Sequence, residues 1–115
     1  MEEKPPYCSG FVVAAKKGNI KKLKNMFNNI SKLSTKEEQC FYALYFAAFN
    51  GHVNIVKFLI SKNINPNFVI GSYLTPLHAA VFSKNNEKIV PILLNAKANV
   101  NPKIKVTNSR FMVIN

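Results

Sequence analysis

The chain has 115 residues, a length that suits one domain and leaves no room for a second. Hydrophobic residues make up 48% of it, which is enough to form a core. Its net charge of +11 comes from 15 Lys and one Arg against 5 Glu and no Asp. No apolar run approaches the roughly 18 residues that a membrane-spanning helix requires, so a helical membrane protein is excluded.

The first residues, from Met1 to Pro6, are acidic and rich in proline, whereas a secretion signal is basic and then apolar. We therefore expect a soluble, cytoplasmic protein. Cys8 and Cys40 are the two cysteines, and a disulfide framework is not indicated by so few. Both are expected to be reduced thiols.

The positive charge has two explanations. The chain is crowded with Lys, Asn, Ile and Phe, and this combination is typical of a biased genome composition. The alternative is an electrostatic function directed at an acidic or polyanionic partner.

The first predicted helix pair starts after Gly10. Residues 11–17 form a short apolar helix that ends at Gly18, because glycine tolerates the left-handed backbone of a helix C-terminus. Asn19 caps a second helix, whose apolar residues recur at intervals of three and four. These residues are Ile20, Leu23, Met26 and Phe27.

The connection over residues 28–41 contains Ser34-Thr35-Lys36-Glu37, a capping-box sequence that can start a helical turn. We expect a nonstandard loop there. The second helix pair follows, with one helix from Tyr42 to Gly51 and another from His52 to Ile60. The apolar stripe of the latter is Ile55, Val56, Leu59 and Ile60.

The third helix pair starts at Thr75-Pro76, a hydroxyl cap followed by proline at the first helical position. Its second helix repeats the apolar stripe one residue late, and the closing glycine is missing, so we expect an irregular turn over residues 83–86. Residues 63–74 and 97–108 carry Pro and Asn without helical periodicity and are predicted to be extended connections.

Small residues recur at a fixed interval of 33 along the chain. Ala14-Ala15 and Ala47-Ala48 each begin an Ala-Ala-x-x-Gly unit, and Ala80 lies 33 residues after Ala47. A period of this length indicates a repeat architecture, in which each unit buries its apolar face against its neighbours.

Together, Thr75-Pro76-Leu77-His78, Gly51-His52, the apolar stripes and Ala98-Asn99-Val100-Asn101 resemble the ankyrin repeat. The resemblance implies an all-α solenoid of antiparallel helix pairs joined by extended finger loops, forming a single domain over residues 1–115. Its repeats are expected at about 5–33, 38–67 and 71–101, with a partial C-terminal cap at 104–115. The first two helix starts lack the Thr-Pro-Leu-His sequence, so they are less well specified. We expect residues 111–114 to pack on the third helix pair.

No catalytic or metal site is expected. The separations of Cys8, Cys40, His52 and His78 match no zinc-ligand spacing. The resemblance gives both histidines structural roles at turns and helix starts. Because carboxylates are few and no Gly-rich phosphate loop is present, we expect neither an enzyme nor a cofactor.

The resemblance implies a concave binding strip for a partner protein, made of first-helix positions and finger tips. Its aromatic members Phe49 and Phe82 either anchor a partner or pack between adjacent first helices. The residues predicted to contact the partner are Lys16, Lys17, Glu38, Gln39, Phe41, Phe49, Asn50, Ser72, Leu74, Phe82, Ser83, Lys105 and Val106. If lysines gather on this strip, the partner is expected to be acidic.

Other functions stay open. Lys16, Lys17, Lys21, Lys22 and Lys24 lie in the first repeat, and such a cluster binds the phosphates of nucleic acid through counterion release. A self-associating module is a third option, although we expect a monomer. The composition also resembles ankyrin proteins of intracellular microbes and viruses, which implies a host-directed role in the host cytosol or nucleus.

Overall fold

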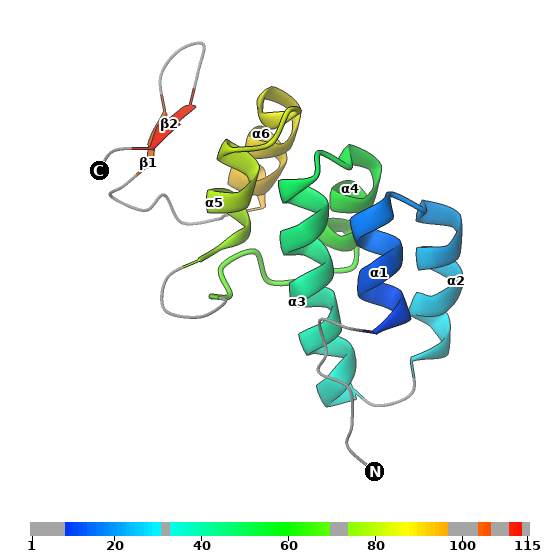
Figure 1. Cartoon of the computed structure of the whole chain (residues 1–115). Coiled ribbons are helices and arrows are strands. Elements are labelled where there is room, and N and C mark those ends of the chain that lie inside the picture. The colour runs from blue at the N-terminus through cyan, green and yellow to red at the C-terminus, as the bar shows by residue number, and fades with distance from the viewer. Residues whose placement is uncertain (1–8, 31–32, 70–73, 97–103, 107–110, 114–115) are drawn as a thin grey trace.

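A computed structural model describes residues 9–30, 33–69, 74–96, 104–106 and 111–113 of the chain (Figure 1). Side-chain surroundings are described for residues 9–30, 36–69 and 74–96. The described elements, in chain order, are α1 (Gly10–Lys17), α2 (Ile20–Asn29), α3 (Leu33–Phe49), α4 (Val53–Ser61), α5 (Pro76–Val81), α6 (Asn86–Asn95), β1 (Ile104–Val106) and β2 (Phe111–Val113).

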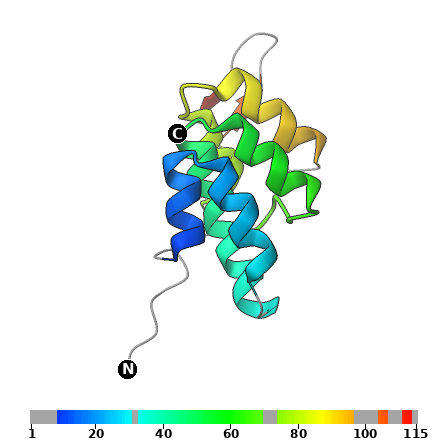
Figure 2. The same ribbon diagram turned by 90° about the vertical axis from the view of Figure 1, so that its right-hand side faces the viewer.

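The helices form three antiparallel pairs that stack side by side. α1 packs against α3 and α3 against α5, and each of these first helices also packs against the helix that follows it. The second helices α2, α4 and α6 form the other layer of the stack (Figure 2). This arrangement is the helical solenoid predicted from the 33-residue period.

Paired small residues allow the first helices to approach closely. Ala14, Ala15, Ala47, Ala48 and Ala80 are all buried. The apolar stripes of the second helices are buried against them. The largest fully buried side chains of the core are Phe11, Leu23, Leu44, Ile55, Leu59, Leu77, Ile89 and Leu93.

Glycine closes the first two helix–helix turns, as predicted. Gly18 and Gly51 have φ values of +78° and +79°, in the left-handed region that side chains disfavour. The third turn has no glycine, and its helix ends at Phe82 with an ordinary right-handed backbone. There the Ser83 hydroxyl accepts a hydrogen bond from the backbone N–H of Asn85 at 3.1 Å. The irregular turn is therefore confirmed.

Hydrogen bonds join each repeat to the one before it. His52 Nε2 donates to the carbonyl of Lys16 at 2.9 Å, and the Asn85 amide donates to the carbonyl of Gly51 at 2.7 Å. Both side chains sit at the N-cap of a second helix, and neither caps its own helix. Asn19, in the first described helix pair, differs from them, because its side chain accepts from Lys22 N–H at 3.2 Å.

The predicted loop before the second helix pair is wrong over residues 33–41. α3 is one continuous helix from Leu33 to Phe49, so these residues are helical and no helix starts at Tyr42. The intervening residues 36–41 contain neither Gly nor Pro, and Cys40 is fully buried in the core. No residue of that stretch ends a helix, and the burial of Cys40 stabilises a helix that continues through it.

The other two first helices have capped starts. In α5, Thr75 Oγ1 accepts from His78 N–H at 3.3 Å, and Thr75 N–H donates to His78 Nδ1 at 3.2 Å, forming a reciprocal capping box. In α1, the Ser9 hydroxyl accepts from Val12 N–H at 3.2 Å. The first helix start is thus better specified than its sequence indicated.

A short antiparallel hairpin adds to the helical solenoid at the C-terminal end. β1 pairs with β2 in the register Ile104 with Val113 and Val106 with Phe111. The backbone of β2 lies beside α5, at the end of the stack (Figure 1). Position 114, in the run expected to pack on the third helix pair, lies outside the described residues.

Candidate protein-interaction surface

Two exposed phenylalanines occupy equivalent positions in consecutive repeats. Phe49 ends α3 and Phe82 follows α5, and their side chains are 50% and 67% exposed. These exposures show that neither ring is buried between adjacent first helices. Solvent exposure of two large apolar rings on one strip is typical of a contact surface rather than of a core.

The equivalent position in the first repeat is held by a lysine that contacts an aromatic ring. Lys16 Nζ lies 4.2 Å from the centroid of the Phe46 ring. The carbonyl of Lys16 also accepts from the Asn50 amide at 3.2 Å, so Lys16 and Asn50 are both tied to the scaffold. Lys17 is exposed.

Phe46 was missed by the sequence analysis. It lies three residues before Phe49, and the corresponding positions in the other repeats are Val13 and Ala79. Variation between repeats at a single position was the available signal, because scaffold positions keep the same type of residue. Phe46 and Tyr45 also contact each other edge to face, with ring centroids 5.5 Å apart.

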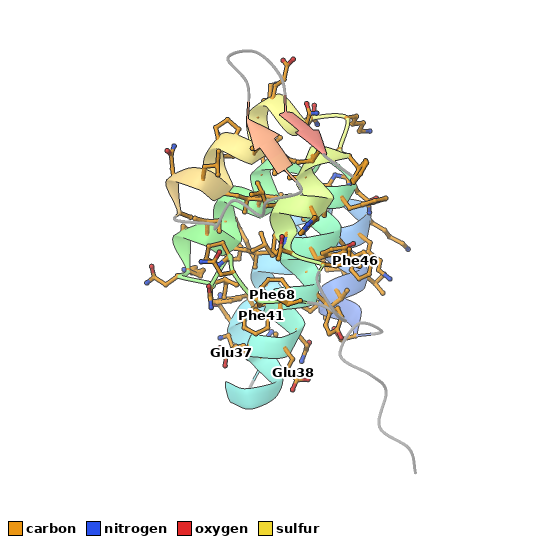
Figure 3. The ribbon with its side chains drawn as sticks, turned by 90° about the vertical axis from the view of Figure 1, so that its left-hand side faces the viewer. Glu37, Glu38, Phe41, Phe46 and Phe68 are labelled. Atoms are coloured by element: carbon orange, nitrogen blue, oxygen red, sulfur yellow. The ribbon has the colours of Figure 1, made fainter. Side chains whose placement is uncertain are left out.

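Three predicted finger residues lie on α3 instead of on a loop. Glu38 is exposed, Gln39 is half-buried and Phe41 is half-buried. The ring of Phe41 stacks on that of Phe68, with centroids 4.3 Å apart and planes 16° from parallel (Figure 3). One face of Phe41 is therefore covered by the connection after α4, which leaves less of the ring for a partner.

The remaining predicted contact residues differ in their placement. Leu74 is 37% exposed, immediately before the cap of α5. Ser83 was predicted to contact the partner, but its side chain is only 5% exposed. Its hydroxyl instead accepts a hydrogen bond within the third turn. Ser72 lies outside the described residues. Lys105 and Val106 belong to β1, whose side chains are not described.

Both histidines have structural roles. His78 caps α5 and His52 bonds the first repeat to the second, as the resemblance implied. Within the described ranges, no three His, Cys, Asp or Glu side chains gather closely enough to hold a metal ion. Cys40 is buried at the centre of α3, and this burial raises the pKa of its thiol to about 11.

The lysines of the first repeat are mostly exposed. Lys21, Lys22 and Lys24 lie on the solvent side of α2, and Lys17 lies at the end of α1. Lys24 Nζ approaches the ring of Phe58 at 5.6 Å. Lys21, Lys22 and Lys24 therefore belong to the second-helix layer, whereas Lys17 belongs to a first helix and is one of the residues predicted for the partner-binding strip. In the part of the chain that the structure describes, no helix has the length and apolarity needed to cross a membrane.

Comparison with known proteins agrees with this geometry. The family model for ankyrin repeats, in three copies, matches residues 11–104. The chain therefore belongs to the ankyrin-repeat family, whose members are protein–protein interaction modules and are generally non-catalytic.

Individual relatives match the chain over only a small part of their own length. The chain is 38% identical over 82 residues to mouse (Mus musculus) inactive serine/threonine-protein kinase TEX14. It is 36% identical over 93 residues to the NAD-capped RNA hydrolase NUDT12 of Homo sapiens and of Macaca fascicularis. These matches cover 71% and 80% of the chain, but only 6% of TEX14 and 20% of NUDT12.

Proposed function

We propose that the chain binds a partner protein through the strip formed by its first helices and connections, and that it catalyses no reaction. The observation that carries the proposal is the exposure of Phe49 and Phe82 at equivalent positions. Lys17 and Leu74, which are exposed, and Asn50, which is half-buried, are further members of the proposed strip. A rigid stack presents these side chains in fixed positions, so little ordering entropy opposes binding.

The test is a double substitution, Phe49→Ala with Phe82→Ala. Because both rings are exposed, their removal should leave the melting temperature nearly unchanged. Truncating an aromatic anchor costs about 2 kcal/mol, or roughly a 30-fold loss of affinity for each ring that acts as one. The measurement is affinity capture of cell proteins on the immobilised chain, quantified by mass spectrometry.

A matched control carries Lys57→Ala with Lys88→Ala, two exposed positions of the second-helix layer. The proposal expects proteins that the unsubstituted chain enriches to be lost with the phenylalanine variant and kept with the control. Their retention by the phenylalanine variant would place the site elsewhere. Enrichment of no protein at all would contradict protein binding.

A second candidate function is the binding of nucleic acid or another polyanion through the first repeat. The exposure of Lys17, Lys21, Lys22 and Lys24 favours it. Such binding weakens steeply as salt rises, with a slope set by the number of phosphates neutralised. Affinity for a labelled random-sequence oligonucleotide, measured across a salt series, tests it. Weak binding already at low salt contradicts this alternative.

The proposal includes a host-directed role, in which the protein acts in the cytosol or nucleus of a host cell. Its support is the composition, which is rich in Lys, Asn, Ile and Phe. Affinity capture from animal, plant and bacterial lysates in parallel tests this part. Selective enrichment from one eukaryotic lysate is expected, and enrichment from the bacterial lysate alone contradicts it.

A further inference from the structure

A cavity of about 370 Å³ lies between α2, the N-terminal half of α3 and the connection that follows α4. Ligand pockets in proteins span roughly 300–1,000 Å³, so this cavity lies at the small end of that range and has room for a large side chain. Its apolar surface comes from Phe27, Cys40, Phe41 and Ile64. Part of its lining comes from residues 36–41 of α3, where a loop was predicted.

Two ammonium groups stand at this cavity. Lys36 Nζ lies 4.0 Å and Lys62 Nζ 5.7 Å from the centroid of the Phe27 ring. The two lysines come from different elements, α3 and the C-cap of α4, and meet over the same ring. Such contacts hold flexible lysine chains near the position in which a ligand would meet them, which lowers the entropy lost on binding.

One carboxylate shares the cavity wall. Glu37 follows Lys36 on α3 and is exposed, so its charge is partly screened by solvent. Two cations against one anion leave the mouth net positive. An apolar floor below a net positive rim is complementary to an apolar group that carries negative charge beside it.

From this combination we propose that the cavity is a second docking site, which takes a bulky apolar side chain of a partner segment flanked by Asp or Glu. The side chain would fill the floor formed by Phe27, Cys40 and Ile64, and the flanking carboxylates would pair with Lys36 and Lys62. A protein segment fits better than a free small molecule because the wall residues Lys62 and Asn63 are exposed and open onto the surface. Neither Phe49 nor Phe82 lines this cavity, although Phe41 of the predicted strip does.

The probe is a fluorescein-labelled peptide amide of sequence Glu-Glu-Phe-Glu-Glu, with binding followed by fluorescence anisotropy at physiological salt. We expect saturable binding that weakens at least tenfold when alanine replaces the peptide's phenylalanine, because the cavity floor is then unfilled. The double variant Lys36→Gln with Lys62→Gln should also weaken binding at least tenfold. Lys57→Gln with Lys88→Gln carries the same change of charge and should have little effect.

If the Lys36/Lys62 and Lys57/Lys88 double variants lose the same affinity for the peptide, binding depends only on the chain's general positive charge. That result would overturn the proposal. So would the absence of saturable binding, or equal affinity for the alanine peptide. Lys36→Arg with Lys62→Arg keeps both charges and should keep most of the affinity.

Backbone amide NMR shifts in the unsubstituted protein make the test independent of any variant's folding. Peptide-induced shifts at Cys40 and Ile64 are expected. Shifts confined to Phe49 and Phe82 would assign the peptide to the strip and overturn the separate site. The Phe49→Ala with Phe82→Ala variant should bind the peptide normally even if the proposed strip proves wrong.

Discussion

Side chains at equivalent positions of the repeats form different hydrogen bonds, depending on which repeat they belong to. The second-helix N-cap residue is Asn19, His52 or Asn85. In the first repeat it caps its own helix, and in the later two it bonds the preceding turn. In the later two repeats, a backbone carbonyl of the preceding repeat lies within reach of this side chain. Helix termini always leave such groups unsatisfied, so a neighbour's side chain can take them.

Cys40 gives a prediction at the same scale. Its burial favours the neutral thiol and raises its pKa from 9.0 to about 11, while nearby Lys36 opposes the shift and Glu37 adds to it. The neutral thiol therefore contributes stability that is complete below pH 9 and is lost as the pH rises toward 11. Between pH 8 and pH 11 the unsubstituted protein should lose more stability than Cys40→Ala does.

Urea unfolding of both proteins at each pH measures this difference. The two proteins differ only at position 40, so contributions of the other residues cancel in the comparison. Parallel stability profiles of the two proteins would show that the thiol does not titrate as its burial requires.

At the scale of elements, glycine decides how the first two helix pairs turn. A Cβ added at Gly18 would lie 2.7 Å from the His52 ring, whereas at Gly51 its nearest neighbour would be 3.1 Å away. Both positions have the left-handed backbone, which costs an alanine about 1–2 kcal/mol. The first turn thus combines a backbone constraint with a contact to the next repeat.

We predict that Gly18→Ala destabilises the protein by more than Gly51→Ala does. The additional cost comes from displacing His52, which bonds the Lys16 carbonyl. The free energy of unfolding in urea measures both variants. In a His52→Ala background the two alanine substitutions should cost about the same, and a persisting difference would contradict the assigned contact.

For the whole molecule, stability depends on what covers each end of the stack. Each repeat of a solenoid contacts only its neighbours, so a terminal helix pair needs a cap on its outer side. At the C-terminal end the described backbone of β2 lies beside α5. The hairpin of β1 and β2 is therefore placed to cover the last repeat.

Deleting residues 109–115 should lower the melting temperature by at least about 4 °C, which corresponds to about 1 kcal/mol for a domain of this size. The loss is expected because β1 loses its partner strand and α5 loses its neighbour. Deleting residues 114–115 alone keeps both strands and serves as the control. An unchanged melting temperature after the longer deletion would show that the hairpin does not cap the stack.

Local patterns anticipated much of the scaffold and less of the surface. Gly18, Asn19 and the Thr75–His78 cap each act through neighbours within a few residues, so their roles were readable from sequence. The extension of α3 was not, because the capping-box sequence at residues 34–37 also suits a short turn. Of the strip, the exposure of Phe49 and Phe82 could not be decided from sequence, since an apolar side chain at that position suits a core or a contact surface equally.

The sequence by itself determined the repeat period, the antiparallel helix pairs and the ankyrin family. These features depend on the spacing of small and apolar residues, and that spacing recurs in each repeat. Only the tertiary structure decided that α3 continues from Leu33 and that Lys36 and Lys62 meet over Phe27. Those features depend on contacts between residues far apart in the chain. The burial of Cys40 and the stacking of Phe41 on Phe68 stabilise the longer helix. Local helix propensity does not include such tertiary contacts.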